Sequence, residues 1–148
     1  MKIQDFEKDL VVDKTIEKEG YDFFHFESEP FKLYGGIKRG ENGMFYRVPP
    51  EVADRCNKSV QNRCTDTSGA RIKFRTNSQR FAVVATYHKA SIFAHFPMTA
   101  TVGLDLYADG VYSGTFLPPS KLPNLAFEAE ISLVGEQKER EILINLPL

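Results

Sequence analysis

Three side chains of this sequence have the types that a nucleophilic triad needs. Asp22 and His25 stand three positions apart, as an orienting acid and a general base could. Nucleophilic catalysis also needs a serine hydroxyl within hydrogen-bond reach of the base. Ser68 has the most nucleophile-like context, but it lies in a Thr-Ser-Gly cluster that is typical of a turn. We therefore predict that this chain contains no catalytic residue.

The histidines and cysteines do not have the spacing of metal ligands. His25, His88 and His95 are isolated and form no H-x-H or H-E-x-x-H pattern. Cys56 and Cys64 fit no zinc motif, and two cysteines cannot form a disulfide framework, so we expect free thiols. The sequence therefore predicts no metal site and no cofactor. His95 lies beside a loop marked by proline, and it is the histidine best suited to line a surface.

One predicted strand carries three cationic side chains that could bind an anion or a sugar. Arg71, Lys73 and Arg75 alternate with other residues, so their side chains point to one side of the strand. An arginine fork can pair with a carboxylate or a phosphate, and such cations could also bind a sugar. The alternative is a solvated face, or internal ion pairs with carboxylates such as Asp105. We favour this alternative.

Aromatic residues are dense near the N-terminus, where they could stack on sugar rings if exposed. The chain has no Trp, so its other aromatic residues are needed to fill the core. We therefore expect most of these side chains to be buried. They are Tyr21, Phe23, Phe24, Phe26, Phe31 and Tyr34.

Alternation of apolar and polar residues predicts the elements that carry these groups. Asp105 and Tyr107 alternate with leucines, which is the period of a half-buried strand, and the Asp-Gly pair at 109–110 predicts a hairpin. Further strands are predicted at 44–48, 70–76, 81–87, 111–116, 125–133 and 141–146, with an edge strand at 3–18. The hairpin strand is predicted to begin at residue 101, and residues 50–55 to form one short helix turn. The pattern favours an all-β, jelly-roll-like β-sandwich.

The composition is that of a single domain over residues 1–148 without a strong charge. The 148 residues are 42% hydrophobic, which is enough to build a core without disulfides or metals. A net charge of −1 gives no basis for a nucleic-acid partner. No apolar run reaches the about 18 residues that span a membrane, so no membrane partner is expected. The N-terminus lacks the apolar region of a signal peptide, so we expect a cytoplasmic protein.

Several segments in a fixed order resemble one known family. The run Gly103-Leu104-Asp105-Leu106-Tyr107 resembles the Gly-x-Asp-Leu-Tyr signature of the N-terminal domain of bacterial SGNH (GDSL-like) esterases. Segments 44–49, 68–78, 97–99 and 144–148 resemble further elements of that domain. The resemblance covers about residues 34–148 and is weaker over residues 1–30.

The resemblance implies an accessory β-sandwich followed by a C-terminal SGNH hydrolase domain that acts on a carbohydrate ester or a lipid ester. The Gly-Asp-Ser nucleophile, the oxyanion-hole blocks and the terminal Asp-x-x-His of that hydrolase are missing here. It therefore implies a chain cut before the hydrolase domain and without esterase activity of its own. The role that could carry over is to shape or cover the neighbouring active site, or to aid substrate binding. Arg71, His95, Asp105 and Tyr107 are then the candidate binding residues, and a buried Arg71–Asp105 ion pair would explain two of them equally well.

Two hypotheses from other classes stay open. A free-standing carbohydrate-binding β-sandwich module would show exposed aromatic residues along one face of a sheet. A structural or oligomerising domain would show a large exposed apolar patch.

Overall fold

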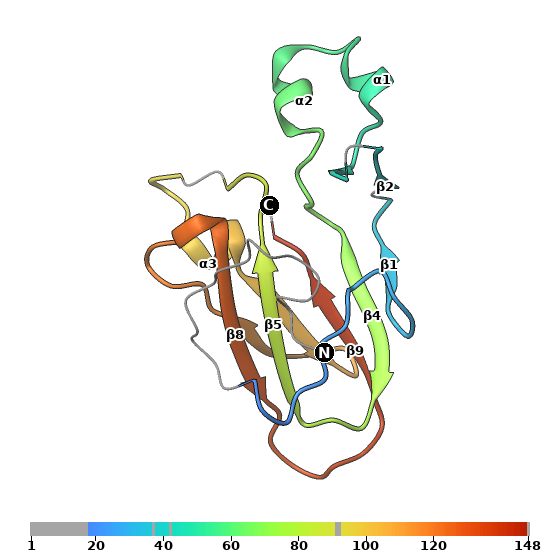
Figure 1. The fold of residues 1–148 in the computed structure, drawn as a ribbon, viewed down its shortest axis with the longest axis vertical. Helices are drawn as coiled ribbons and strands as arrows, with labels where there is room; N and C mark the ends of the chain where they lie inside the picture. The colour runs from blue at the N-terminus through green and yellow to red at the C-terminus, as the bar shows by residue number, and fades with distance from the viewer. Residues whose placement is uncertain (1–17, 37, 42, 91–92, 148) are drawn as a thin grey trace.

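The chain folds as a sandwich of antiparallel strands, as Figure 1 shows. The computed structural model describes residues 18–36, 38–41, 43–90 and 93–147, so the edge strand predicted at 3–18 lies outside the described residues except for its last position. One layer is a five-stranded sheet in the order β1 (Lys32–Tyr34), β4 (Arg71–Thr76), β9 (Arg140–Asn145), β6 (Leu104–Ala108) and β7 (Val111–Phe116). The facing layer pairs β5 (Arg80–Thr86) with β8 (Ala126–Ser132), and a small separate ribbon pairs β2 (Lys38–Arg39) with β3 (Phe45–Tyr46). The predicted all-β sandwich is confirmed.

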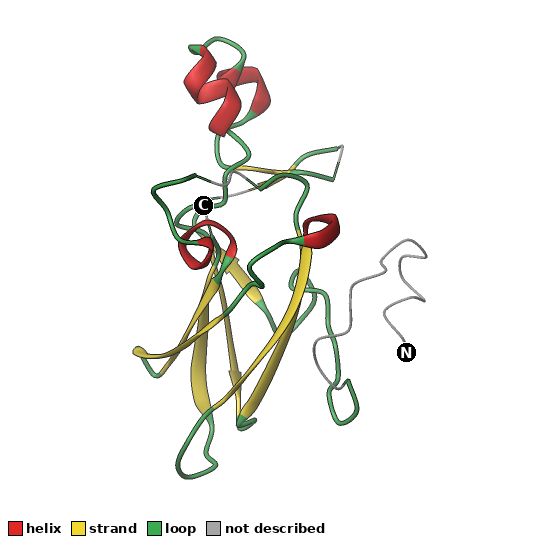
Figure 2. Ribbon diagram, turned by 90° about the vertical axis from the view of Figure 1, so that its left-hand side faces the viewer, coloured by secondary structure: helices red, strands yellow, loops and turns green. Residues whose placement is uncertain are grey.

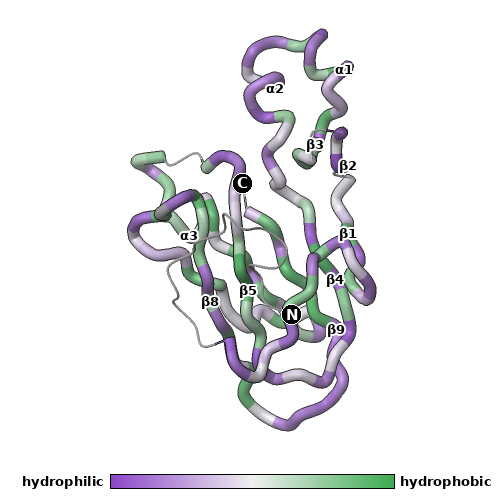
Figure 3. Tube along the Cα trace, viewed as in Figure 1, coloured by the Kyte–Doolittle hydropathy of each residue, from purple (hydrophilic) through white to green (hydrophobic). Residues whose placement is uncertain are grey.

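The core lies between the two layers, where every second residue of each strand points. Leu106 and Ile142 from the sheet and Phe127 from β8 are fully enclosed, and Phe116 closes the end of β7. Each such side chain stabilises the fold by about 1.5 to 3 kcal/mol through removal of apolar surface from water. Figure 3 shows the resulting alternation of hydrophobic and polar residues along the strands.

The helices are short and lie at one end of the sandwich. The expected helix turn is α1 (Pro50–Ala53), with a proline at its start. Two further helices were not predicted, α2 (Lys58–Arg63) and α3 (Met98–Val102), and a 3-10 turn, η2, spans Pro123–Leu125. The strand predicted from residue 101 therefore begins at 104, because residues 98–102 form α3. The β2–β3 ribbon, α1 and α2 form an arm that extends beyond the sandwich (Figure 1).

The described N-terminal residues from Lys18 to Tyr21 lie over part of the outer surface of the β5–β8 layer, where the side chains of Arg80 and Glu130 stay about half exposed. Lys18 Nζ lies 2.5 Å from Oε1 of Glu128, whose side chain is fully buried on β8. The Tyr21 hydroxyl donates to Glu130 Oε2 at 2.9 Å, and the Arg80 guanidinium lies 4.7 Å from the centre of the Tyr21 ring. We call this surface the covered face. Figure 2 shows the strands of the sandwich from the side, with helices of the arm beyond one end of them.

Candidate functional site

The strand register brings two of the candidate residues into one line on the outer face of the five-stranded sheet. Arg71 on β4 pairs with Asn145 on β9, and Asn145 pairs with Asp105 on β6. Residues directly opposite each other in an antiparallel pair place their side chains on the same face. β1 and β7 extend this line at both ends, and the complete polar row is Tyr34, Arg71, Asn145, Asp105 and Thr115.

Asp105 is held by a chain of hydroxyl groups and not by Arg71. Thr115 Oγ1 donates to Asp105 Oδ1 at 2.5 Å, and the Tyr112 hydroxyl lies 2.8 Å from Thr115 Oγ1. Because Thr115 gives its single hydroxyl proton to Asp105, Tyr112 must be the donor in the second bond. Arg71 is exposed, and within the described ranges it forms no ion pair with Asp105. The buried Arg71–Asp105 pair considered from the sequence is therefore not formed.

The three outward-facing cations of β4 differ in their partners. Lys73 Nζ lies 3.0 Å from Glu141 Oε1, and Arg75 Nη2 lies 3.0 Å from Glu139 Oε2. The Arg71 guanidinium makes no hydrogen bond or ion pair with any residue that the structure describes. From the sequence we favoured a solvated face or internal ion pairs, and Lys73 and Arg75 form such pairs, with Glu141 and Glu139 and not with Asp105. Arg71 keeps a planar guanidinium that can receive a carboxylate at two nitrogens.

Tyrosines surround the polar row. Tyr34 is 47% exposed and Tyr112 is 57% exposed, and the Tyr107 ring lies 5.6 Å from that of Tyr112 in an edge-to-face arrangement. Leu143 pairs with Lys73 on one side and with Tyr107 on the other. The polar row and these residues together form the outer face of the five-stranded sheet, which we call the open face.

The Gly-x-Asp-Leu-Tyr run divides its side chains between the core and the open face. A Cβ at Gly103 would lie 2.4 Å from the carbonyl oxygen of Thr99, so only glycine lets the last turn of α3 pack this closely. Leu104 and Leu106 enter the core. Asp105 and Tyr107 alternate with them and face outward. Each position of this run therefore has a structural reason, and two of them also shape the open face.

His95 is not on a strand and is not part of the polar row. It is exposed in the loop before α3, where its ring centre lies 4.9 Å from that of Phe96 and 5.7 Å from that of Phe93. The prediction that it lines a surface agrees with this exposure. Its contacts are aromatic and give it no acid or base partner among the described residues.

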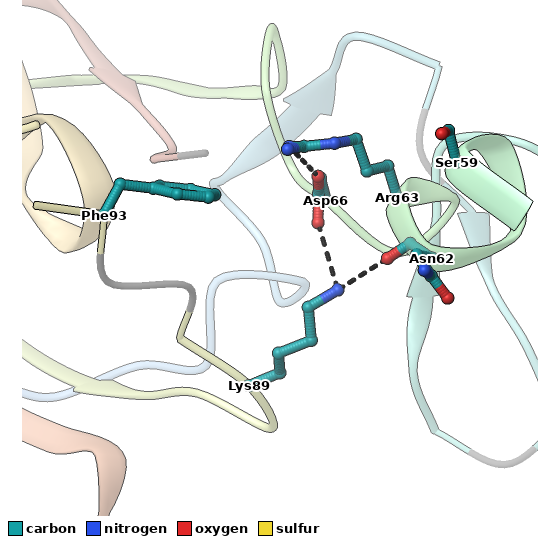
Figure 4. Close-up of a pocket in the computed structure, with 6 residues that line it drawn as sticks. All are labelled: Ser59, Asn62, Arg63, Asp66, Lys89 and Phe93. Carbon is teal, nitrogen blue, oxygen red and sulfur yellow. Dashed lines mark hydrogen bonds and ion pairs between the residues drawn. The ribbon is translucent and has the colours of Figure 1, made fainter. Parts of the chain in front are cut away.

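An open hollow of about 490 Å³ lies between α2 and the loop that carries Phe93 (Figure 4). Lys89 Nζ reaches across it to the carbonyl oxygen of Asn62 at 2.7 Å and to Asp66 Oδ1 at 3.4 Å. The Arg63 guanidinium lies 5.7 Å from the centre of the Phe93 ring and pairs with Asp66. Its cations already have partners within the chain, so we interpret the hollow as the joint between the arm and the sandwich.

The residues considered for a nucleophilic triad do not come together. His25 lies 3.6 Å from Glu27 and stacks on Phe26, and Ser28 Oγ donates to its backbone oxygen. Within the described part of the chain no serine hydroxyl contacts an imidazole, and Ser68 lies in the loop before β4. The residues that the structure describes contain no group of three His, Cys, Asp or Glu side chains that could hold a metal ion. None of the described helices has the length and the apolar character needed to cross a bilayer.

Sequence reasoning missed three members of the polar row. Thr115 was within reach, because the hairpin at 109–110 places it opposite Asp105 once the turn is known. Tyr34 and Asn145 join the row only through pairing between distant strands. No local pattern in the sequence signals such pairing.

Comparison with known proteins identifies one family. The family model named GxDLY and described as "N-terminus of Esterase_SGNH_hydro-type" matches residues 21–148. No curated protein matches this chain.

Two solved structures resemble the fold. A Bacteroides ovatus protein described as a "putative GDSL-like lipase" is 23% identical, with a TM-score of 0.64 over 78% of this chain and 34% of its own. The salicylyl-acyltransferase SsfX3 from a tetracycline biosynthetic pathway is 21% identical, with a TM-score of 0.55 over 82% of this chain and 34% of its own. The present chain thus spans about a third of the length of each of these proteins.

Proposed function

Because this chain belongs to the family of N-terminal domains of SGNH hydrolase-type esterases, we propose that it is a non-catalytic accessory domain. It precedes a C-terminal SGNH hydrolase domain in the same parent chain, and it shapes or covers the active site of that neighbour or helps to bind its ester substrate. The observation that carries the proposal is the family match over residues 21–148. The lack of any contact between a serine hydroxyl and an imidazole in the described ranges supports the non-catalytic part.

The geometry of the C-terminal strand favours a role at the boundary between two domains. β9 is the middle strand of the five-stranded sheet, and it leaves the sheet at the end that carries α3 and the arm (Figure 1). Thr67 Oγ1 donates to the Pro147 carbonyl oxygen at 2.8 Å, and the Leu146 amide donates to the Ala70 oxygen at 2.9 Å. These bonds hold residues 146–147 against the segment that precedes β4.

Ester hydrolysis by the chain and by its parent tests the proposal. Residues 1–148 should hydrolyse p-nitrophenyl acetate no faster than buffer, and the parent chain with its downstream domain should be active. Removal of residues 1–148 from the parent should then lower kcat/KM, because the accessory domain contributes to the site. Turnover by the isolated chain that His25→Ala or Ser68→Ala abolishes would overturn the proposal.

One observation favours a second function, a free-standing carbohydrate-binding module. Exposed Tyr34 and Tyr112 could stack on sugar rings, while Arg71 and Asp105 offer donors and acceptors for hydroxyl groups. Calorimetric titration of residues 1–148 with plant and bacterial oligosaccharides distinguishes the two functions. Saturable binding that Tyr112→Ala removes would favour the module, and no heat with any glycan would exclude it for the sugars used.

A further inference from the structure

The outward charged side chains of the two outer faces of the sandwich differ in their partners. On the covered face, the outward carboxylates of Glu128 and Glu130 are met by Lys18 and Tyr21 of the N-terminal segment. On the open face no described residue forms a hydrogen bond or an ion pair with the Arg71 guanidinium. Arg71 thus differs from Lys73 and Arg75 of the same face, because it is exposed and has no partner among the described residues.

The position of Arg71 in the sheet indicates which chemistry a partner surface would need. β4 lies between β1 and β9, so the guanidinium rises from the interior of the sheet and not from its edge. Exposed tyrosines lie at both ends of the row, where Tyr34 is its first member beside Arg71 and Tyr112 contacts Thr115. Arginine and tyrosine are among the residue types enriched at the energetic hot spots of protein interfaces. An anchor of this kind fits a surface that carries a carboxylate opposite Arg71.

The end of β9 lies beside the open face, which favours the following part of the parent chain as the partner of that face. Asn145 stands in the polar row beside Arg71, and only two described residues follow it. A segment that continues from there starts at the border of the open face. The chain spans 34% of each similar solved structure, so about two thirds of those chains lies outside the matched length.

We propose that the open face is the docking surface for the domain that follows residue 148 in the parent chain, and that a carboxylate of that domain pairs with Arg71. This inference rests on the proposed function, because it needs that domain to exist. It adds the surface that the domain uses and the residue that anchors it. Arg75 provides a matched control, since it has the same side chain on the same strand and face but is already paired with Glu139.

Cysteine labelling measures whether the open face is covered. Tyr34→Cys places a thiol beside Arg71, and Val134→Cys places one in a loop where the native side chain is 97% exposed. Each is made in a Cys56→Ser background, because Cys56 is exposed, and is labelled with a maleimide in residues 1–148 alone and in the parent chain. We expect the Tyr34→Cys thiol to react about tenfold more slowly in the parent chain, since an inaccessible thiol is unreactive, and the Val134→Cys thiol to react equally in both.

A second pair of variants tests the anchor. In the parent chain with Tyr34→Cys, adding Arg71→Ala should raise the labelling rate by about tenfold, because loss of one partner of an interfacial ion pair weakens docking. Adding Arg75→Ala should leave the rate unchanged. If Tyr34→Cys alters folding, Leu143→Cys on β9 of the same face replaces it.

The outcomes separate the two proposals. An active parent chain whose open-face thiols react as fast as in residues 1–148 alone would overturn the docking surface and leave the accessory function standing. A parent chain without a hydrolase domain would overturn both. Slow labelling that Arg71→Ala and Arg75→Ala leave equally unchanged would overturn the role of Arg71.

Discussion

The covered face and the open face are built from strands with the same alternation, yet the chain treats them differently. On β8, Glu128 faces outward and is nevertheless fully buried, because the N-terminal segment brings Lys18 to it. On β4, Arg71 faces outward, is exposed and has no partner among the described residues. A polar residue at an outward position is thus no evidence of contact with water. What decides its surroundings is whether a distant segment of the chain, or of another domain, lies over it.

The largest expected effect comes from breaking the ion pair of the covered face. Lys18→Ala leaves the buried Glu128 carboxylate without the ammonium group beside it, so we expect the free energy of unfolding to fall by about 3 kcal/mol. Arg75→Ala is the control, because it removes an exposed pair with Glu139, and it should cost less than about 1 kcal/mol. Urea unfolding of both variants measures the difference. Equal losses would show that the N-terminal segment does not seal Glu128.

Loss of the Asp105 carboxylate should have the next largest effect. Asp105→Ala removes the acceptor of the Thr115 hydroxyl on the open face, and a hydrogen bond to a charged group contributes about 1.5 kcal/mol or more. Thr115→Val should cost a similar amount, and the double variant should cost less than the sum of the two, since both remove one interaction. Urea unfolding of the three variants tests this. Full additivity would mean that the two side chains act independently.

Tyr87 links β8 to α3, and the free energy that it contributes to folding should depend on pH. Its ring stacks on Phe127 of the covered layer, and its hydroxyl donates to the Val102 carbonyl oxygen of α3 at 2.5 Å. Burial raises the pKa of the Tyr87 hydroxyl well above its usual value. Tyr87→Phe should therefore lower stability near pH 7 by about 1 kcal/mol through loss of this bond.

The sign of the pH effect follows from that raised pKa. In the unfolded chain the Tyr87 hydroxyl loses its proton near pH 10, whereas the folded chain keeps it to higher pH. The contribution of the neutral hydroxyl is thus complete below about pH 10 and declines by about 1.4 kcal/mol per pH unit above it. Unfolding in urea should show wild type more stable than Tyr87→Phe at about pH 8 and without that advantage at about pH 11, because the loss of about 1.4 kcal/mol exceeds the about 1 kcal/mol of the hydrogen bond. A gap that stays constant would contradict a buried, neutral Tyr87.

The sequence could predict the strands but not which faces would be covered. Alternation around Asp105 and along β4 is local, and it placed the inward and outward positions correctly. The pairing of Arg71 with Asn145 and the contact of Lys18 with Glu128 join residues far apart in the chain, so no local pattern encodes them. α2 was missed for a physical reason as well. It buries no residue, so it has no apolar face whose periodicity could reveal a helix.

The smallest expected effect is the most informative about the open face. Arg71→Ala in residues 1–148 alone should change the free energy of unfolding by less than about 0.5 kcal/mol, because the side chain is exposed and no described residue pairs with it. The same change at Asp105 should cost several times as much, although both residues stand in one row and on one face. Urea unfolding of the two variants side by side measures that ratio. A large loss for Arg71→Ala would mean that Arg71 is a structural residue of the sandwich, and the open face would then lose the free cation on which its docking role depends.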